Sequence, residues 1–126
     1  MKARVFVYGS LRKGASNAWR MERTRFIGSA TVSGTLVKVD WYPGLVLKGD
    51  TAVKGEVYEV DEQTLAELDA FEGIVSDEVY NGEYKRIKGK VQFEHDETCE
   101  CFIYEWQLGV AAYEVVANGD WLTVML

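Results

Sequence analysis

Near its start the chain reads Val5-Phe6-Val7-Tyr8-Gly9-Ser10-Leu11, a short apolar run that ends in a glycine turn. Such a run predicts a buried strand, and the turn predicts that this strand stops at Gly9. A turn of this kind presents successive backbone N–H groups to one concavity, which suits an anion or a developing oxyanion. An ordinary turn is the alternative reading, and it is the commoner one for this stretch taken alone.

Further strand signals follow along the chain. β-Branched and alternating residues predict strands at 32–39 and 53–60, separated by a turn at 40–44 that holds the only proline. Two more strands are predicted at 84–93 and 99–106, on either side of an acidic turn, which is typical of a hairpin with a longer connection. The periodicity therefore predicts a small α+β domain in which most strands are antiparallel.

The best helix signal begins at Asp61, which can act as an N-cap. The apolar residues Leu65, Leu68 and Phe71 recur at intervals of three and form one stripe. Gly73 is a good stop signal. We also expect a short helix within 17–26, a loop at 74–82, and a turn that starts a helix at 118–122.

The end of this helix carries the first candidate catalytic group. Glu72 follows the apolar stripe directly, and Asp69 lies one turn earlier. A carboxylate held against an apolar wall has a raised pKa, which suits a general base. The alternative is a solvated helix end, which is the usual environment of an isolated glutamate. A third candidate segment is 82–86, where Tyr84 and Arg86 share one face if the segment is a strand.

Composition narrows the classes of function. The 126 residues suggest one domain, residues 1–126, with 48% hydrophobic residues and a net charge of -6. The negative charge argues against a general nucleic-acid binder. No apolar stretch approaches a membrane span or a secretory signal, so we expect a cytoplasmic protein without a membrane partner. The basic residues near the N-terminus are expected on a solvated face: Arg12, Lys13, Arg20, Arg23 and Arg25.

Two further chemistries are disfavoured. Cys99 and Cys101 are two residues apart, which does not suit an ordinary disulfide, and with His95 they fall short of the four ligands of a structural zinc site. We therefore expect no metal. Gly9 and Gly14 have the spacing of a phosphate-binding loop, but Gly14 is followed by Ala15-Ser16 instead of Lys and Ser or Thr.

The order of these motifs resembles the γ-glutamylcyclotransferase-like family. The matching segments are the Tyr8-Gly9-Ser10-Leu11 turn, Tyr42-Pro43-Gly44, the strand 53–58, the helix end 68–73 and Tyr84-Lys85-Arg86. The Tyr-Gly-Ser-Leu form is similar to the small branch with γ-glutamylamine cyclotransferase, plant avirulence-induced proteins and uncharacterised bacterial members. The resemblance implies a small mixed, mostly antiparallel β-barrel with flanking helices.

The resemblance also implies a reaction and a set of site residues. The α-amine of a γ-glutamyl group attacks its own γ-carbonyl and releases 5-oxoproline and a free amine, without a cofactor. By position, Glu72 matches the catalytic glutamate, Tyr8 to Leu11 match the substrate-binding loop, and Tyr84 matches a pocket tyrosine; Arg86 is only its motif neighbour. A non-catalytic binding domain with the same fold is the alternative, and the leaving amine stays open.

Three aromatic residues have two readings at this stage. Trp19, Trp41 and Tyr42 either line the side of the pocket that takes the leaving group or belong to the core. The core reading is favoured, because aromatic residues are more often buried.

Overall fold

The computed structural model describes residues 2–73 and 83–124. The predicted loop at 74–82 lies outside these residues. The strands and helices, in chain order, are β1 (Lys2–Val7), the short 3-10 helix η1 (Ala18–Met21), β2 (Arg25–Lys38), β3 (Pro43–Asp61), α1 (Glu62–Phe71), β4 (Tyr84–Phe93), β5 (Thr98–Trp106), β6 (Glu114–Val115) and α2 (Trp121–Val124).

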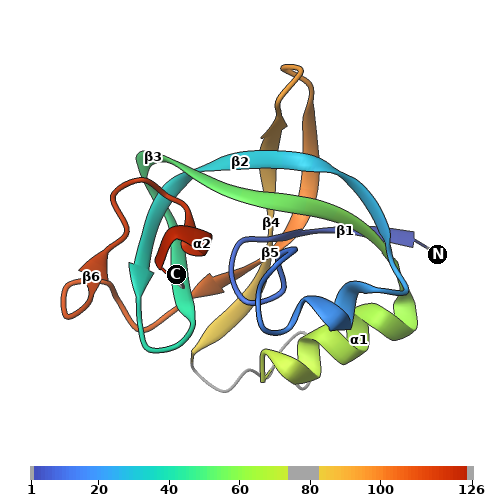
Figure 1. Cartoon of the computed structure of the whole chain (residues 1–126), viewed down its shortest axis with the longest axis horizontal. Coiled ribbons are helices and arrows are strands. Elements are labelled where there is room, and N and C mark those ends of the chain that lie inside the picture. Colours follow the sequence, from blue (N-terminus) through green and yellow to red (C-terminus); the bar gives the residue numbers. More distant parts are fainter. Residues whose placement is uncertain (1, 74–82, 125–126) are drawn as a thin grey trace.

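Five strands close into a barrel (Figure 1). The order is β3-β1-β5-β4-β2, and a second pairing of β2 with β3 closes the ring, while β6 adds to the outer side of β2. Every pairing is antiparallel except β1 with β5, where Val5 lies opposite Phe102. The fold is therefore the mostly antiparallel barrel with flanking helices that the family resemblance implies.

The two longest strands exceed their predicted bounds. β3 is 19 residues long and β2 is 14, whereas the sequence predicted only 53–60 and 32–39. The polar residues around Gly49 hide the first half of β3 from a periodicity argument. Pairing with β2 holds the residues on both sides of this polar stretch. The partner of Gly34 is Thr51 and that of Thr35 is Val46, so residues 47–50 of β3 bulge out of the ladder.

A short helix lies within 17–26, as expected, but it is a single 3-10 turn. Only residues 18–21 form a 3-10 turn, and the last two residues of the range, Arg25 and Phe26, already belong to β2. They pair with Glu59 and Tyr58 of β3. The hydrogen bonds of the sheet therefore outweigh the weak helical preference of this segment.

The predicted helix at Asp61 is confirmed. The side chain of Asp61 accepts a hydrogen bond from the backbone N–H of Thr64 at 2.7 Å, and Leu65 and Leu68 are buried. Gly73 ends the helix at a φ of 80°, which a residue with a Cβ rarely adopts. The helix lies along the outside of the barrel, next to η1 (Figure 1).

Two apolar clusters meet at β1, because its side chains alternate between the faces of the sheet. Phe6 and Tyr8 point into the barrel interior, which Trp121 of α2 also fills. Val5 and Val7 face the other way and pack with Leu65 and Leu68 of α1 and its neighbours. The chain segment after Val7 therefore emerges between the barrel and α1, where a site can form.

The basic residues near the N-terminus do not share one environment. Arg12 is 8% exposed, in contrast to the solvated face expected for it. Its guanidinium donates to Glu56 at 2.6 Å and to Asp120 at 2.9 Å. Arg20, Arg23 and Arg25 are exposed as expected. None of the described helices is long and apolar enough to cross a membrane.

Candidate active site

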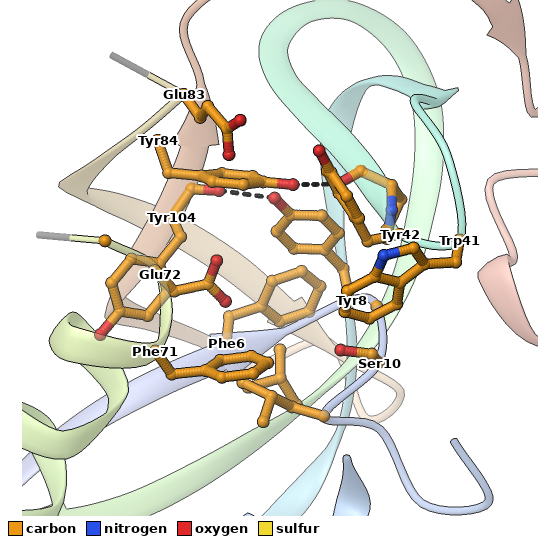
Figure 2. Close-up of a pocket in the computed structure, with 15 residues that line it drawn as sticks. Phe6, Tyr8, Ser10, Trp41, Tyr42, Phe71, Glu72, Glu83, Tyr84 and Tyr104 are labelled. Atoms are coloured by element: carbon orange, nitrogen blue, oxygen red, sulfur yellow. Dashed lines mark hydrogen bonds between the residues drawn. The ribbon is translucent and has the colours of Figure 1, made fainter. Parts of the chain in front are cut away.

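A pocket opens where the end of β1 meets the end of α1. Its volume of about 230 Å³ is below the usual range of sites for drug-sized ligands and suits a small metabolite. The lining comes from five parts of the chain: Phe6 to Leu11, Trp41 to Pro43, Phe71 to Gly73, Glu83 with Tyr84, and Tyr104. All six residues predicted for the site, Tyr8, Gly9, Ser10, Leu11, Glu72 and Tyr84, are among them (Figure 2).

The Tyr8-Gly9-Ser10-Leu11 turn forms one wall of the pocket. The Tyr8 hydroxyl donates to the backbone carbonyl of Tyr104 at 2.6 Å, which fixes the end of β1 against β5. The backbone N–H of Arg12 returns to the Gly9 carbonyl at 3.0 Å and closes the turn. Within the described part of the chain, the N–H groups of Ser10 and Leu11 have no hydrogen-bond partner. This turn can therefore offer donors to a ligand.

Gly9 is required by close packing across the pocket. A Cβ at this position would lie 2.7 Å from Cγ of Pro43. Real Cβ atoms do not approach other heavy atoms so closely, and the proline ring cannot bend away as a long side chain can. The Tyr-Gly-Ser-Leu turn and the Tyr42-Pro43-Gly44 segment, which the sequence separates by more than thirty residues, are thus neighbours in the site.

A buried ion-pair network holds this turn from behind. Arg12 bridges Glu56 of β3 and Asp120 before α2, and the second carboxylate oxygen of Glu56 accepts the N–H of Lys13 at 2.9 Å. Asp120 also accepts the N–H of Leu122 at 3.1 Å, which caps the C-terminal helix. The conformation of the turn therefore depends on a carboxylate near the far end of the chain.

Glu72 faces the turn from the opposite wall. It directly follows α1, and its N–H donates to the Leu68 carbonyl at 2.9 Å. Its side chain points into the pocket between Phe6 and Tyr104 (Figure 2). Burial of the carboxyl group raises the pKa of Glu72 to about 7, with smaller contributions from the negative charges of Glu83 and Asp69. Glu72 therefore exchanges a proton near neutral pH, which a solvated helix end would not do.

Tyrosines shape the remaining wall. The Tyr84 hydroxyl donates to the Pro43 carbonyl at 2.5 Å, so Tyr84 ties the start of β4 to the start of β3. Burial raises the pKa of Tyr84 and of Tyr8 well above the usual value, so both hydroxyls stay protonated donors. Tyr42 and Trp41 line the same pocket, and their ring centroids are 5.0 Å apart.

The prediction that these aromatic residues belong to the core is wrong for Trp19 and Trp41. Trp41 is 60% exposed at the pocket, and Trp19 is 58% exposed and lies outside the set of lining residues. Trp19 stacks instead under the guanidinium of Arg20, whose Cζ lies 4.4 Å from the ring centroid. Of the three aromatic residues considered for the leaving-group side, only Trp41 and Tyr42 reach the pocket.

Asp69, whose negative charge contributes to the raised pKa of Glu72, belongs to a second polar cluster. Asp69 accepts hydrogen bonds from Arg86 at 2.5 Å and from the Tyr104 hydroxyl at 2.7 Å. Arg86 and Tyr104 lie opposite each other in the β4–β5 ladder, so both can reach the same carboxylate. The sequence offered Asp69 and Arg86 separately, but nothing marked Tyr104 or Glu83 as pocket residues before the strand register was known.

The pocket offers carboxylates and hydroxyls but no grouped metal ligands. The described residues contain no cluster of three or more His, Cys, Asp or Glu side chains that could hold an ion. The groups that line the pocket support proton transfer by Glu72 and hydrogen bonding by the turn. The expectation that the site works without a metal stays a prediction.

Comparison with known proteins agrees with this arrangement. A family model described as "Gamma-glutamyl cyclotransferase, AIG2-like" matches residues 5–123. The "Gamma-glutamylcyclotransferase family protein YtfP" of Escherichia coli (strain K12) is 35% identical over 120 residues, covering 94% of this chain and 96% of that protein. The chain belongs to the γ-glutamyl cyclotransferase, AIG2-like family.

Solved structures of relatives have the same fold. An AIG2-like protein from Mus musculus superposes with a TM-score of 0.76 at 31% identity, covering 89% of this chain and 82% of that one. An uncharacterised protein, PH0828, from Pyrococcus horikoshii superposes with a TM-score of 0.72 at 27% identity, covering 97% and 92% of the two chains.

Proposed function

We propose that this protein is a γ-glutamylcyclotransferase-type enzyme that releases 5-oxoproline and a free amine from a small γ-glutamyl compound. The observation that carries the proposal is the position of Glu72, a carboxyl group with a pKa of about 7 that faces a turn whose Ser10 and Leu11 N–H groups find no partner among the described residues. Desolvation of a carboxyl group has a cost in stability, and perturbed pKa values are concentrated at acid–base sites, which favours the enzyme over a binding domain.

Glu72 acts as the proton carrier in this scheme. The α-ammonium group of the substrate has a pKa near or above neutral pH and cannot attack while it is protonated. Glu72 takes one proton, the amine nitrogen bonds to the γ-carbonyl carbon and loses a second proton as the lactam forms, and the bond from that carbon to the leaving nitrogen breaks. The leaving nitrogen gains both protons, one of them from the carboxyl group of Glu72, and departs as an ammonium group. The reaction is balanced internally, so the proposal includes no cofactor.

The turn at Ser10 and Leu11 stabilises the negative charge of the substrate or of the reaction intermediate. Its N–H groups, which no described residue occupies, can bind the α-carboxylate of the substrate or the oxyanion that develops on the γ-carbonyl. Removing a single oxyanion donor typically costs about 10²–10³ in rate. Because the network of Arg12 holds this turn rigidly, the donors need little reorganisation when the charge develops.

The pocket supports an intramolecular attack by its shape. Its small volume and aromatic walls favour a folded γ-glutamyl chain in which the amine lies against the carbonyl. Well-oriented internal attack contributes roughly 7–11 kcal/mol to lowering the barrier. Trp41 and Tyr42 stand at the open side, so we assign the leaving amine to that side.

The test is 5-oxoproline release from a panel of γ-glutamyl compounds by the wild type and by Glu72→Gln. The panel contains glutathione, γ-glutamyl amino acids, γ-glutamyl-lysine and γ-glutamylated antibiotics. We expect release from at least one compound and a loss of at least ~10²-fold in Glu72→Gln, as for a general base. Glu67→Gln is the matched control, because Glu67 is exposed on the same helix.

Two results would contradict the proposal in different ways. Release that survives Glu72→Gln would remove Glu72 from its catalytic role. Binding of 5-oxoproline near Glu72 without turnover of any panel compound would favour the alternative of a binding domain with this fold. Release that depends on Glu72 from a γ-glutamylated antibiotic alone would instead indicate the removal of a γ-glutamyl protecting group.

A further inference from the structure

The open side of the pocket combines aromatic rings with a carboxylate. Trp41 and Tyr42 line this side, and their rings meet at 79° with centroids 5.0 Å apart. We call this pair the aromatic corner. Trp41 is 60% exposed, so its side chain is accessible to a ligand. Glu83 lines the same pocket, and Figure 2 shows its carboxylate and the Tyr42 hydroxyl on the same side of the view.

Negative charge gathers at the aromatic corner. Burial raises the pKa of Tyr42, and the negative charges of Glu83 and Asp40 add to this rise, so both carboxylates act on its hydroxyl. Glu83 also adds to the raised pKa of Glu72, so its charge reaches across the pocket. The net charge of the whole chain, -6, has the same sign. A leaving group at this side therefore enters a negative field, which attracts cations and repels anions.

Basic groups adjoin other parts of the pocket. None of the described lining residues is Lys, Arg or His. Arg20 stacks on Phe71 of α1, with its Cζ 4.2 Å from the ring centroid. Arg86 pairs with Asp69 of the same helix, and Arg12 pairs with two carboxylates behind the turn. These contacts tie the arginines to the walls formed by the turn and α1, and none of them involves the aromatic corner.

This distribution of charge disfavours a carboxylate on the leaving group. The leaving parts of glutathione and of γ-glutamyl amino acids carry such a carboxylate. No described lining residue supplies a cation to pair with it, and the sequence of residues 74–82 contains no Lys, Arg or His. Glu83 and Asp40 would repel it. A carboxylate at the aromatic corner would therefore lose water without gaining a cationic partner, which costs affinity.

We propose that the preferred substrate is the γ-glutamyl amide of a diamine, whose second ammonium group binds between the aromatic corner and Glu83. This inference rests on the proposed function, because it names the leaving group of the same reaction. Aromatic faces attract cations, tryptophan most strongly, and Glu83 supplies the opposite charge. The α-carboxylate at the other end of the substrate has the N–H groups of Ser10 and Leu11. The second ammonium group keeps its protons throughout, so the products are 5-oxoproline and the free diamine.

The test compares three γ-glutamyl amides that differ only at the far end of the leaving group. Their leaving amines are 1,4-diaminobutane, pentylamine and 4-aminobutanoate, which place a cation, no charge and an anion at the same position along the chain. We expect kcat/KM for 5-oxoproline release from the cationic amide to exceed that of the neutral amide by about 10-fold. The anionic amide should fall below the neutral one by about 10-fold, because like charges oppose its binding.

Two variants test the residues that hold the cation. Trp41→Leu and Glu83→Gln should each lower the ratio of kcat/KM between the cationic and the neutral amide by about 2–10-fold. The ratio cancels any change in the pKa of Glu72, which affects the amides alike. Trp19→Leu is the matched control for Trp41, because Trp19 is 58% exposed and does not line the pocket. Glu67→Gln, at an exposed position of α1, is the control for Glu83→Gln, and both controls should leave the ratio unchanged.

A binding series separates this inference from the proposed reaction. The glutaryl amides of the same three amines keep the α-carboxylate but lack the attacking amine, so isothermal titration calorimetry measures their affinity without turnover. We expect the same order, with the cationic amide bound about 10-fold more tightly than the neutral one.

The possible outcomes bear on the two proposals separately. Equal affinities, no measurable affinity for the cationic amide, or tighter binding of the anionic amide would overturn the diamine proposal, even where 5-oxoproline is released. A charge ratio that neither Trp41→Leu nor Glu83→Gln changes would also overturn it. A preference for the cationic amide without 5-oxoproline release from any of the three would contradict the proposed function alone.

Discussion

Replacing Glu72 by Gln should stabilise the protein at neutral and alkaline pH while it abolishes activity. Burial raises the pKa of Glu72 from an ordinary 4.5 to about 7, so the folded state resists its ionisation. A shift of 2.5 units corresponds to about 3 kcal/mol at 1.36 kcal/mol per unit. This cost is absent below pH 4.5, grows between pH 4.5 and 7, and is complete above pH 7. Gln carries no charge and avoids it.

The measurement is the free energy of unfolding in urea at pH 4 and at pH 8. We expect Glu72→Gln to exceed the wild type by up to about 3 kcal/mol at pH 8 and to match it at pH 4. Glu67→Gln, the same change at an exposed position of α1, should show no such dependence on pH. An equal difference at both pH values, or a less stable variant at pH 8, would refute the claim that the carboxyl group is desolvated.

Three further variants test the parts around Glu72. The acid limb of the pH–rate profile should have its midpoint near pH 7, where Glu72 loses its proton, and Asp69→Asn should move it to lower pH because one nearby negative charge is removed. Arg12→Leu should cost about 3–5 kcal/mol in urea unfolding, because it leaves a buried carboxylate unpaired. Tyr84→Phe should cost about 1–3 kcal/mol in the same assay, because the Pro43 carbonyl loses its donor.

Matched substitutions give these measurements their controls. Arg23→Leu changes an exposed arginine and should alter the free energy of unfolding by less than about 0.5 kcal/mol. If it costs as much as Arg12→Leu, the buried ion pair is not the cause. Tyr113→Phe removes a hydroxyl that makes no hydrogen bond to residues 2–73 and 83–124, so it should be nearly neutral. A midpoint that Asp69→Asn leaves unchanged would exclude Asp69 as a contributor to the pKa of Glu72.

Local signals were sufficient for several elements of this fold. The bounds predicted for β4 are those observed, because Tyr84 to Phe93 has strong strand character and a clear turn after it. The start and stop of α1 followed from an aspartate that caps the helix and a glycine that ends it. The extent of β2 and β3 did not follow, because pairing between the two strands, from Arg25 opposite Glu59 to Lys38 opposite Pro43, sets their ends and leaves residues 47–50 as a bulge.

Some residues of the candidate site could likewise be predicted from local sequence, and others could not. Tyr8 to Leu11, Glu72 and Tyr84 were found from their motifs and the resemblance that those motifs carry. Tyr104 and Glu83 were missed, because each looks like an ordinary residue of a strand or loop until the register of β4 and β5 places it at the pocket. Arg12 was misjudged because its two carboxylate partners are 44 and 108 residues away in sequence.

The sequence by itself determined the family, the turn after β1, the capped helix and the identity of the carboxyl group at its end. Tertiary structure alone decided what that carboxyl group can do. A pKa depends on how much water surrounds the group and which charges lie nearby, and these come from segments far apart in the chain. The closed barrel brings Phe6, Glu83 and Tyr104 around Glu72, and this enclosure is the reason that its pKa lies near 7.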